Sequence, residues 1–256
     1  MNGMVWCVVC VSAFMLSATG SWGGGATVEV MEVAGGNGAK YRITIDTSET
    51  PDLTEWSHTR LAPVVGAWYP KIVEMLPGTM IVPRKGYVAP GEVTITFTKG
   101  LIGRFIAATD GNHIYCAGNW FRQTLDGEAI GSVVHEMVHV VQQYRLAGLN
   151  NPKAAPVQGW LTEGIADYIR WYLYEPQSPG GEIAKEDLPK VRYDSQYRIS
   201  ANFLNWVVKT YDKDLIAKLN ATIRDGNYSE ALWKQYTGHS VDELNTEWKS
   251  SLARKL

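Results

Sequence analysis

The chain has 256 residues, which is enough for one sizeable domain, or two small ones, with a true hydrophobic core. Hydrophobic residues make up 45% of it and charged residues 20%, proportions that are ordinary for a globular protein. The formal net charge is -2 and no basic run stands out, so the composition gives no support for nucleic-acid binding.

The N-terminal stretch predicts a targeting segment. Residues 1–26 carry no charged side chain, and the apolar run from Met4 to Leu16 is too short to span a bilayer comfortably. Small residues follow, so we expect a secretory signal peptide and leader over 1–26, cleaved somewhere after Ala18. No Lys or Arg precedes the apolar run, which leaves an uncleaved anchor or a disordered leader as the alternative. Cleavage predicts a secreted or periplasmic protein without membrane association.

The cysteines are few. Cys7 and Cys10 lie within the predicted signal, so Cys116 alone remains in the mature chain and no internal disulfide is possible. Export into an oxidising compartment permits disulfides but does not require them. The neighbours of Cys116 are apolar and no basic side chain is adjacent, which favours a small buried residue over a reactive nucleophile.

Strands are predicted mainly in the first half of the chain. Apolar and polar residues alternate there with a period of two, most regularly at 92–99. Residues 51–76 follow a helical pattern instead, in which Pro63 should break or kink the helix. The predicted strands are residues 28–33, 41–46, 92–99, 105–108 and 113–117.

Helices dominate from Asp126 onward. The helix that begins there has a strong apolar face and ends near Gly148. A second helix covers residues 161–174 and is ended by Pro176. Strands followed by helices favour an α+β fold over alternating βαβ units. The remaining helices are predicted at residues 199–210, 215–224, 229–236 and 241–252.

The first of these helices carries the pentapeptide His135-Glu136-Met137-Val138-His139. Residues four apart lie on one face of a helix, so both imidazoles can reach one metal ion. Glu136 lies beside them, where its carboxylate can accept a proton from a water on that ion. Three polar residues on an otherwise apolar helix are hard to explain by packing.

A catalytic zinc site needs a third protein ligand. The next helix offers Glu163, and Asp167 lies one turn further on the same face. We expect Glu163 to complete the site and Asp167 to orient a histidine through a hydrogen bond. The small residues Gly164 and Ala166 would let this helix approach the histidines closely. There are two alternatives. Glu163 could serve only to interact with the positive N-terminal end of its helix, and Asp167 could pair with Arg170 on the surface.

These motifs resemble those of gluzincin zinc metallopeptidases, in which the Glu of the second helix is the third ligand. More narrowly, residues 134–142 (VHEMVHVVQ), 159–170 (GWLTEGIADYIR) and 197–204 (YRISANFL) resemble the basic secretory protein family of plants and bacteria. The similarity runs from about Tyr41 to the C-terminus. This chain departs from that family in being slightly acidic and in lacking the cysteines that plant relatives often carry after the position of Cys116.

The resemblance implies an α+β, zincin-like fold, with a small mixed or antiparallel N-terminal sheet over an active-site helix and a mostly helical C-terminal half. It implies a single metallopeptidase domain over residues 27–256, divided into 27–147 with the sheet and zinc helix and 148–256 with the helical part. It further implies one Zn²⁺ per chain, held by His135, His139 and Glu163, and peptide or protein substrates.

The resemblance also implies a mechanism. Zinc lowers the pKa of its water, and Glu136 accepts the proton as that water attacks the peptide carbonyl. Tyr197 is the candidate donor to the oxyanion, with Tyr193 as the alternative. Substrate is expected to add as a strand along residues 113–117, where His113 is an edge residue rather than a ligand. A secreted binding module that keeps a structural zinc, for example for cell-wall carbohydrate, is the alternative function.

Overall fold

The computed structural model describes residues 27–78, 87–100, 105–195 and 197–255. The signal peptide and leader expected at 1–26 lie outside the described residues. Within the described ranges, the structure has no helix with the length and apolar character needed to cross a membrane.

Five strands form one mixed sheet in the order β1-β2-β3-β5-β4. The pairs β1–β2 and β4–β5 are antiparallel, whereas β2–β3 and β3–β5 are parallel. A small mixed sheet followed by helices confirms the predicted α+β class. The strands are β1 (Val28–Ala34), β2 (Lys40–Asp46), β3 (Glu92–Thr98), β4 (Ala107–Asp110) and β5 (His113–Ala117).

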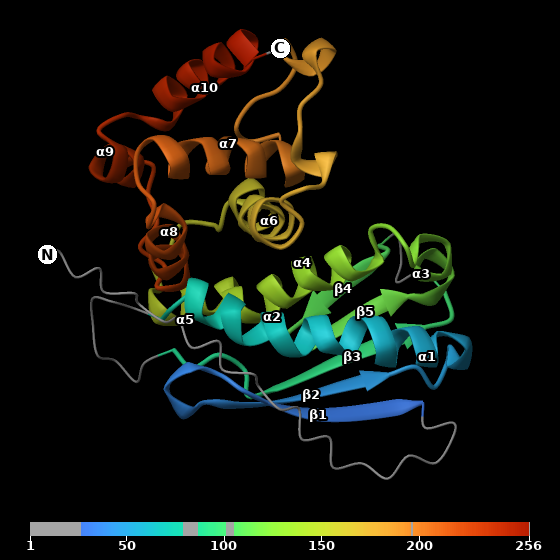
Figure 1. Cartoon of the computed structure of the whole chain (residues 1–256). Helices are drawn as coiled ribbons and strands as arrows, with labels where there is room; N and C mark the ends of the chain where they lie inside the picture. The colour runs from blue at the N-terminus through green and yellow to red at the C-terminus, as the bar shows by residue number, and fades with distance from the viewer. Residues whose placement is uncertain (1–26, 79–86, 101–104, 196, 256) are drawn as a thin grey trace, which may run out of the picture.

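The sheet has one apolar face because its strands alternate in sequence. In β3, Val93, Ile95 and Phe97 are buried, while the intervening threonines are half-buried on the opposite face. Helices cover the apolar face, which places the core between the two layers (Figure 1).

The edge strand differs from the expectation. Strand β5 pairs with both β3 and β4, so the sheet ends at β4 and not at residues 113–117. The chain reverses through Gly111, which has a φ of 64° that glycine adopts without strain, and β4 therefore lies outside β5. His113 is accordingly an interior-strand residue, with its Nε2 2.8 Å from the Thr96 hydroxyl.

Two long helical segments cover the sheet, as Figure 1 shows. The first joins α1 (Thr54–Trp56) to α2 (Ala62–Met75) through a π-helical segment, Ser57–Leu61. Pro63 lies in the first turn of α2, so the expected break is instead a change of helix type. The second, α4 (Ala129–Gln142), is buried over most of its length. The short helix α3 (Gly118–Thr124), which the sequence pattern did not predict, precedes it.

The remaining helices lie mainly on the side of α4 that faces away from the sheet, with α6, α7 and α10 in succession (Figure 1). Helix α6 passes into a π-helical segment, Ile169–Tyr174. The helices are α5 (Ala147–Asn150), α6 (Gly159–Tyr168), α7 (Tyr197–Thr210), α8 (Leu215–Arg224), α9 (Ala231–Thr237) and α10 (Val241–Lys255).

Gly164 has a different neighbour from the one expected. A Cβ on this residue would lie 2.8 Å from Ser200 Cβ and 3.3 Å from Leu204 Cδ1, and both of those residues belong to α7. The missing side chain therefore permits close packing of α6 on α7, rather than the approach of α6 to the histidines of α4.

Arg224 joins the helical half to the C-terminal end of α4. Its side chain is 1% exposed and donates to the carbonyl oxygens of Gln142 at 3.0 Å, Val141 at 2.9 Å and Pro77 at 2.9 Å. The last carbonyls of a helix have no partner within the helix, and a cation there also complements the helix dipole. Arg224 therefore fixes the end of the helix that carries both histidines.

Replacing Arg224 should destabilise the whole domain. The Arg224→Met variant removes the side-chain donor of the Gln142 carbonyl and one of the donors to each of the Val141 and Pro77 carbonyls, and we expect its free energy of unfolding to fall by about 3 kcal/mol. Urea denaturation measures the change. The exposed Arg254 provides the control, because Arg254→Met should change stability by less than about 0.5 kcal/mol. Equal losses in the two variants would contradict a special role for Arg224.

Candidate active site

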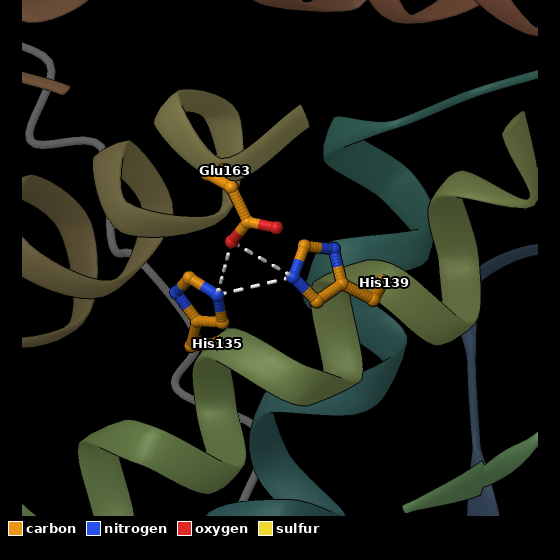
Figure 2. Close-up of side chains that lie close together, drawn as sticks. All are labelled: His135, His139 and Glu163. Carbon is orange, nitrogen blue, oxygen red and sulfur yellow. Dashed lines mark hydrogen bonds and ion pairs between the residues drawn. The ribbon is translucent and has the colours of Figure 1, made fainter. Parts of the chain in front are cut away.

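Three side chains from two helices converge on one point. His135 and His139 come from α4, and Glu163 comes from α6 (Figure 2). The two Nε2 atoms are 3.0 Å apart, and Glu163 Oε2 lies 3.1 Å from Nε2 of His135 and 3.4 Å from Nε2 of His139. In the described part of the chain, this is the one group of His, Cys, Asp or Glu residues whose ligand atoms are close enough to hold a metal ion.

Helix geometry explains how the histidines meet. Their spacing of four residues places them one turn apart on the same face, with ring centroids 4.7 Å apart. The remaining faces of α4 are packed against the sheet and neighbouring helices, so the histidine face can point only toward α6.

Each imidazole has a second partner that orients it. His135 Nδ1 lies 2.7 Å from Asp167 Oδ1, and His139 Nδ1 lies 2.7 Å from Gln142 Oε1. Because both oxygens accept hydrogen bonds, each Nδ1 carries a hydrogen and each Nε2 is the ring nitrogen turned toward Glu163. Gln142 also donates to the Thr162 carbonyl at 3.0 Å, which ties α4 to α6 beside Glu163.

Asp167 therefore lies where the sequence pattern places it. It is 4% exposed and contacts His135, so the alternative of a surface pair with Arg170 is wrong. Arg170 instead pairs with Glu128, at 2.9 Å.

The electrostatics of the cluster favour positive charge. Burial lowers the pKa of His135, but hydrogen bonds with Asp167 and Glu163 outweigh it and raise that pKa to about 10. Burial likewise opposes the charge of His139, whose pKa is nevertheless raised by Glu163. Burial acts to raise the pKa of Glu163, yet the two histidines hold it far below its usual range. Two carboxylates and two imidazoles thus form a buried environment that accommodates a cation.

Glu136 lies beside this cluster without joining it. Its side chain is 8% exposed and borders the same cavity. The Thr109 hydroxyl donates to Glu136 Oε2 at 2.7 Å. The carboxylate is therefore held in place close to the point at which the ligand atoms converge.

The site opens into a cavity of about 800 Å³ between β4, α4, α6 and the start of α7. The residues of β4 form one wall, so the edge of the sheet lies directly beside the histidine cluster. The cavity can therefore accept an extended chain next to β4, the last strand of the described sheet.

The two tyrosine candidates lie in different places. Tyr193 is buried and packs against Trp160, with ring centroids 4.9 Å apart, and against Phe203. Tyr197 is 48% exposed, borders the cavity and stacks over His135 with a centroid separation of 6.3 Å. Its φ of 49° is unfavourable for a bulky residue, and such strained positions concentrate at functional sites. Of the two candidates, Tyr197 is therefore the tyrosine that borders the cavity.

Cys116 is a core residue, as its apolar neighbours predict. Its side chain is fully buried on β5, and burial raises the pKa of its thiol well above the usual range. It takes no part in the cavity described above.

Comparison with known families identifies the chain. A family model described as a peptidase of plants and bacteria (BSP) matches residues 83–248. The chain belongs to this family. The match confirms the resemblance to the basic secretory proteins, and it contains the histidine cluster, Glu136 and Tyr197. It begins later than Tyr41, so β1, β2 and α2 of this peptidase lie outside the matched range. A search of curated proteins finds no match.

Sequence reasoning missed two residues of the site, Thr109 and Gln142. Gln142 lies three positions after His139, so it shares a face with that histidine, and a buried polar residue on such a face signals a hydrogen-bonding role. Thr109 lies opposite Ile114 in the sheet register and therefore faces α4. Thr109 could have been found from the face of the strand to which it points, but that face can be assigned only when the bounds of this short strand are known.

The hydrogen bonds of the imidazoles make a prediction about metal affinity. Asp167→Ala and Gln142→Ala each remove an acceptor from one histidine, so we expect each to weaken binding of Zn²⁺, used as the probe ion, by about 10- to 100-fold. Competition with a chelator measures the affinity. Asp110→Ala is the matched control, because Asp110 is an exposed carboxylate of the same cavity. A loss of similar size in Asp110→Ala would mean that net charge, not hydrogen bonding, sets the affinity.

Proposed function

We propose that this peptidase is a secreted, zinc-dependent enzyme in which His135, His139 and Glu163 hold one Zn²⁺ per chain and Glu136 is the general base. The observation that carries the proposal is the convergence of two imidazole Nε2 atoms and one carboxylate oxygen beside a further, separately held carboxylate. Membership of a peptidase family supports peptides or proteins as substrates.

The donor set fits this ion. Two nitrogens and one carboxylate oxygen are the ligands of a catalytic zinc site, which keeps a further position open. The cavity beside the cluster provides space at that position. When bound, the zinc ion supplies a Lewis acid that polarises the peptide carbonyl and makes water acidic enough to attack near neutral pH.

Glu136 supplies the proton transfers. Its carboxylate accepts the proton of the attacking water and then delivers it to the nitrogen of the leaving amine. Its burial beside the cavity keeps bulk water from competing for that proton. A structural metal site needs ligands but no such base, so the presence of Glu136 favours catalysis over the alternative of a binding module.

Tyr197 is the proposed donor to the oxyanion. Its ring stacks over His135, one of the proposed metal ligands, and lines the same cavity. A hydroxyl aimed at developing negative charge stabilises the transition state more than the ground state.

Secretion rests on residues 1–26, whose uncharged apolar run and small residues are typical of a signal peptide. The mature chain would keep the single buried Cys116, so oxidation in an extracellular compartment would not alter its fold.

The decisive test is the Glu136→Gln variant. We expect about one zinc per chain in both wild type and variant, because Glu136 is not a ligand, with peptide hydrolysis reduced by about 100- to 10,000-fold in the variant. Zinc content is measured by elemental analysis and cleavage by a mixed peptide library. Equal cleavage by the two proteins would exclude Glu136 as the base. A wild type that holds zinc but cleaves no peptide would favour the binding module instead.

Tyr197→Phe tests the oxyanion donor. Removing the hydroxyl should lower kcat by about 100-fold with little change in KM, because the lost hydrogen bond forms only in the transition state. Steady-state kinetics on a single cleaved peptide measure both constants. Tyr193→Phe is the control, since Tyr193 is buried away from the cavity, and it should keep the wild-type kcat. The roles would be reversed if Tyr193→Phe lost activity and Tyr197→Phe did not.

A further inference from the structure

Thr109 connects the edge of the sheet to Glu136. It belongs to β4, and its register opposite the buried Ile114 turns its side chain toward α4. The hydroxyl lies 2.7 Å from Glu136 Oε2 and 3.1 Å from the main-chain oxygen of Glu136, so its single hydrogen is shared between these two acceptors, with the carboxylate the closer. A single short side chain thus contacts both the carboxylate and the backbone of the same helical residue.

Within the described part of the chain, this contact is the only hydrogen bond of the Glu136 side chain. The carboxylate is otherwise 8% exposed and surrounded by the cavity wall. A Glu side chain has several rotatable bonds, and a hydrogen bond from Thr109 to one carboxylate oxygen reduces the number of conformations it can adopt. The other oxygen, Oε1, is then left to take up a proton.

We propose that Thr109 is a positioning residue for the general base. It fixes Glu136 by Oε2, so that Oε1 remains in line with the attacking water. The inference rests on the proposed function, because a general base has a role only if Glu136 takes the proton. Thr109 itself does not contact the reacting atoms and acts through Glu136.

Thr109 also lies on β4, the strand along which a peptide substrate would bind. The backbone of β4 pairs with β5 on one side, and the cavity lies along the strand. A peptide that adds to this edge would contact the strand that holds Glu136. The same strand would then position both the substrate and the base, so the base would keep a fixed place relative to the peptide bond that is cut.

The proposed role of Thr109 predicts an effect on the rate of the reaction rather than on substrate binding. A displacement of a catalytic group by about 1 Å can reduce the rate by about 100-fold, although binding is unchanged. Loss of the Thr109 hydroxyl should therefore lower kcat and leave KM nearly as it is. A purely structural role for Thr109 predicts a lower stability instead, with a normal kcat for the molecules that remain folded.

Three variants test the proposal, with zinc content, kcat and KM measured for each. Thr109→Val keeps the shape and removes the hydroxyl, and we expect kcat to fall by about 10- to 100-fold at unchanged KM and unchanged zinc content. Thr109→Ser restores the hydroxyl and should return kcat to near the wild-type value. Thr96→Val removes another sheet hydroxyl, which contacts His113 rather than Glu136, and should keep the wild-type kcat.

Each other result overturns the inference in an identifiable way. A wild-type kcat in Thr109→Val, or a kcat that Thr109→Ser does not restore, would show that the hydroxyl does not position the base. An equal fall in Thr96→Val would assign the effect to the sheet. If the wild type cleaves peptides and Glu136→Gln does not, these failures concern Thr109 alone. A wild type equal in activity to Glu136→Gln would overturn the proposed function together with this inference.

Discussion

The site depends on one constraint, which is that the buried side chains of His135, Glu136 and Gln142 on α4 must find hydrogen-bond partners on neighbouring elements. An unpartnered polar group in such a position would destabilise the fold by about 1–3 kcal/mol. His135 is paired with Asp167, and Gln142 with the Thr162 carbonyl, so two contacts bind α4 to α6. Thr109 holds Glu136 from the sheet on the other side. The same contacts that keep α4 in place also orient the polar side chains of the candidate site.

The C-terminal helices stabilise this arrangement from a distance. Arg224 on α8 binds the last carbonyls of α4, and it lies far from the histidine cluster along the sequence. Helix α6 is itself held by α7, against which Gly164 packs without a side chain. Glu163 therefore has a fixed position because a second layer of helices supports its helix. Rigid support of this kind keeps three ligand atoms within reach of one ion.

The cavity combines a fixed cluster with an open edge. The histidines and Glu163 lie on helices that are packed on most sides, whereas β4 is an edge strand and Tyr197, which also lines the cavity, is half exposed. The proposed ligands and the proposed base are thus held rigidly, and the residues that would contact a substrate lie at the exposed side of the cavity. This division suits an enzyme whose reacting groups must be in place before a flexible chain arrives.

Local patterns in the sequence predicted most of the elements and the candidate ligands, because a spacing of four residues on a helix and alternation on a strand act over short distances. They are sufficient for His135, His139 and Glu163, and for Asp167 as the partner of a histidine. The tertiary structure alone decided the rest. The strand order put β4 at the edge, Gly164 against α7, Tyr193 in the core and Thr109 against Glu136. These outcomes depend on which distant segments pack together, and such packing is a property of the whole chain that no local periodicity records.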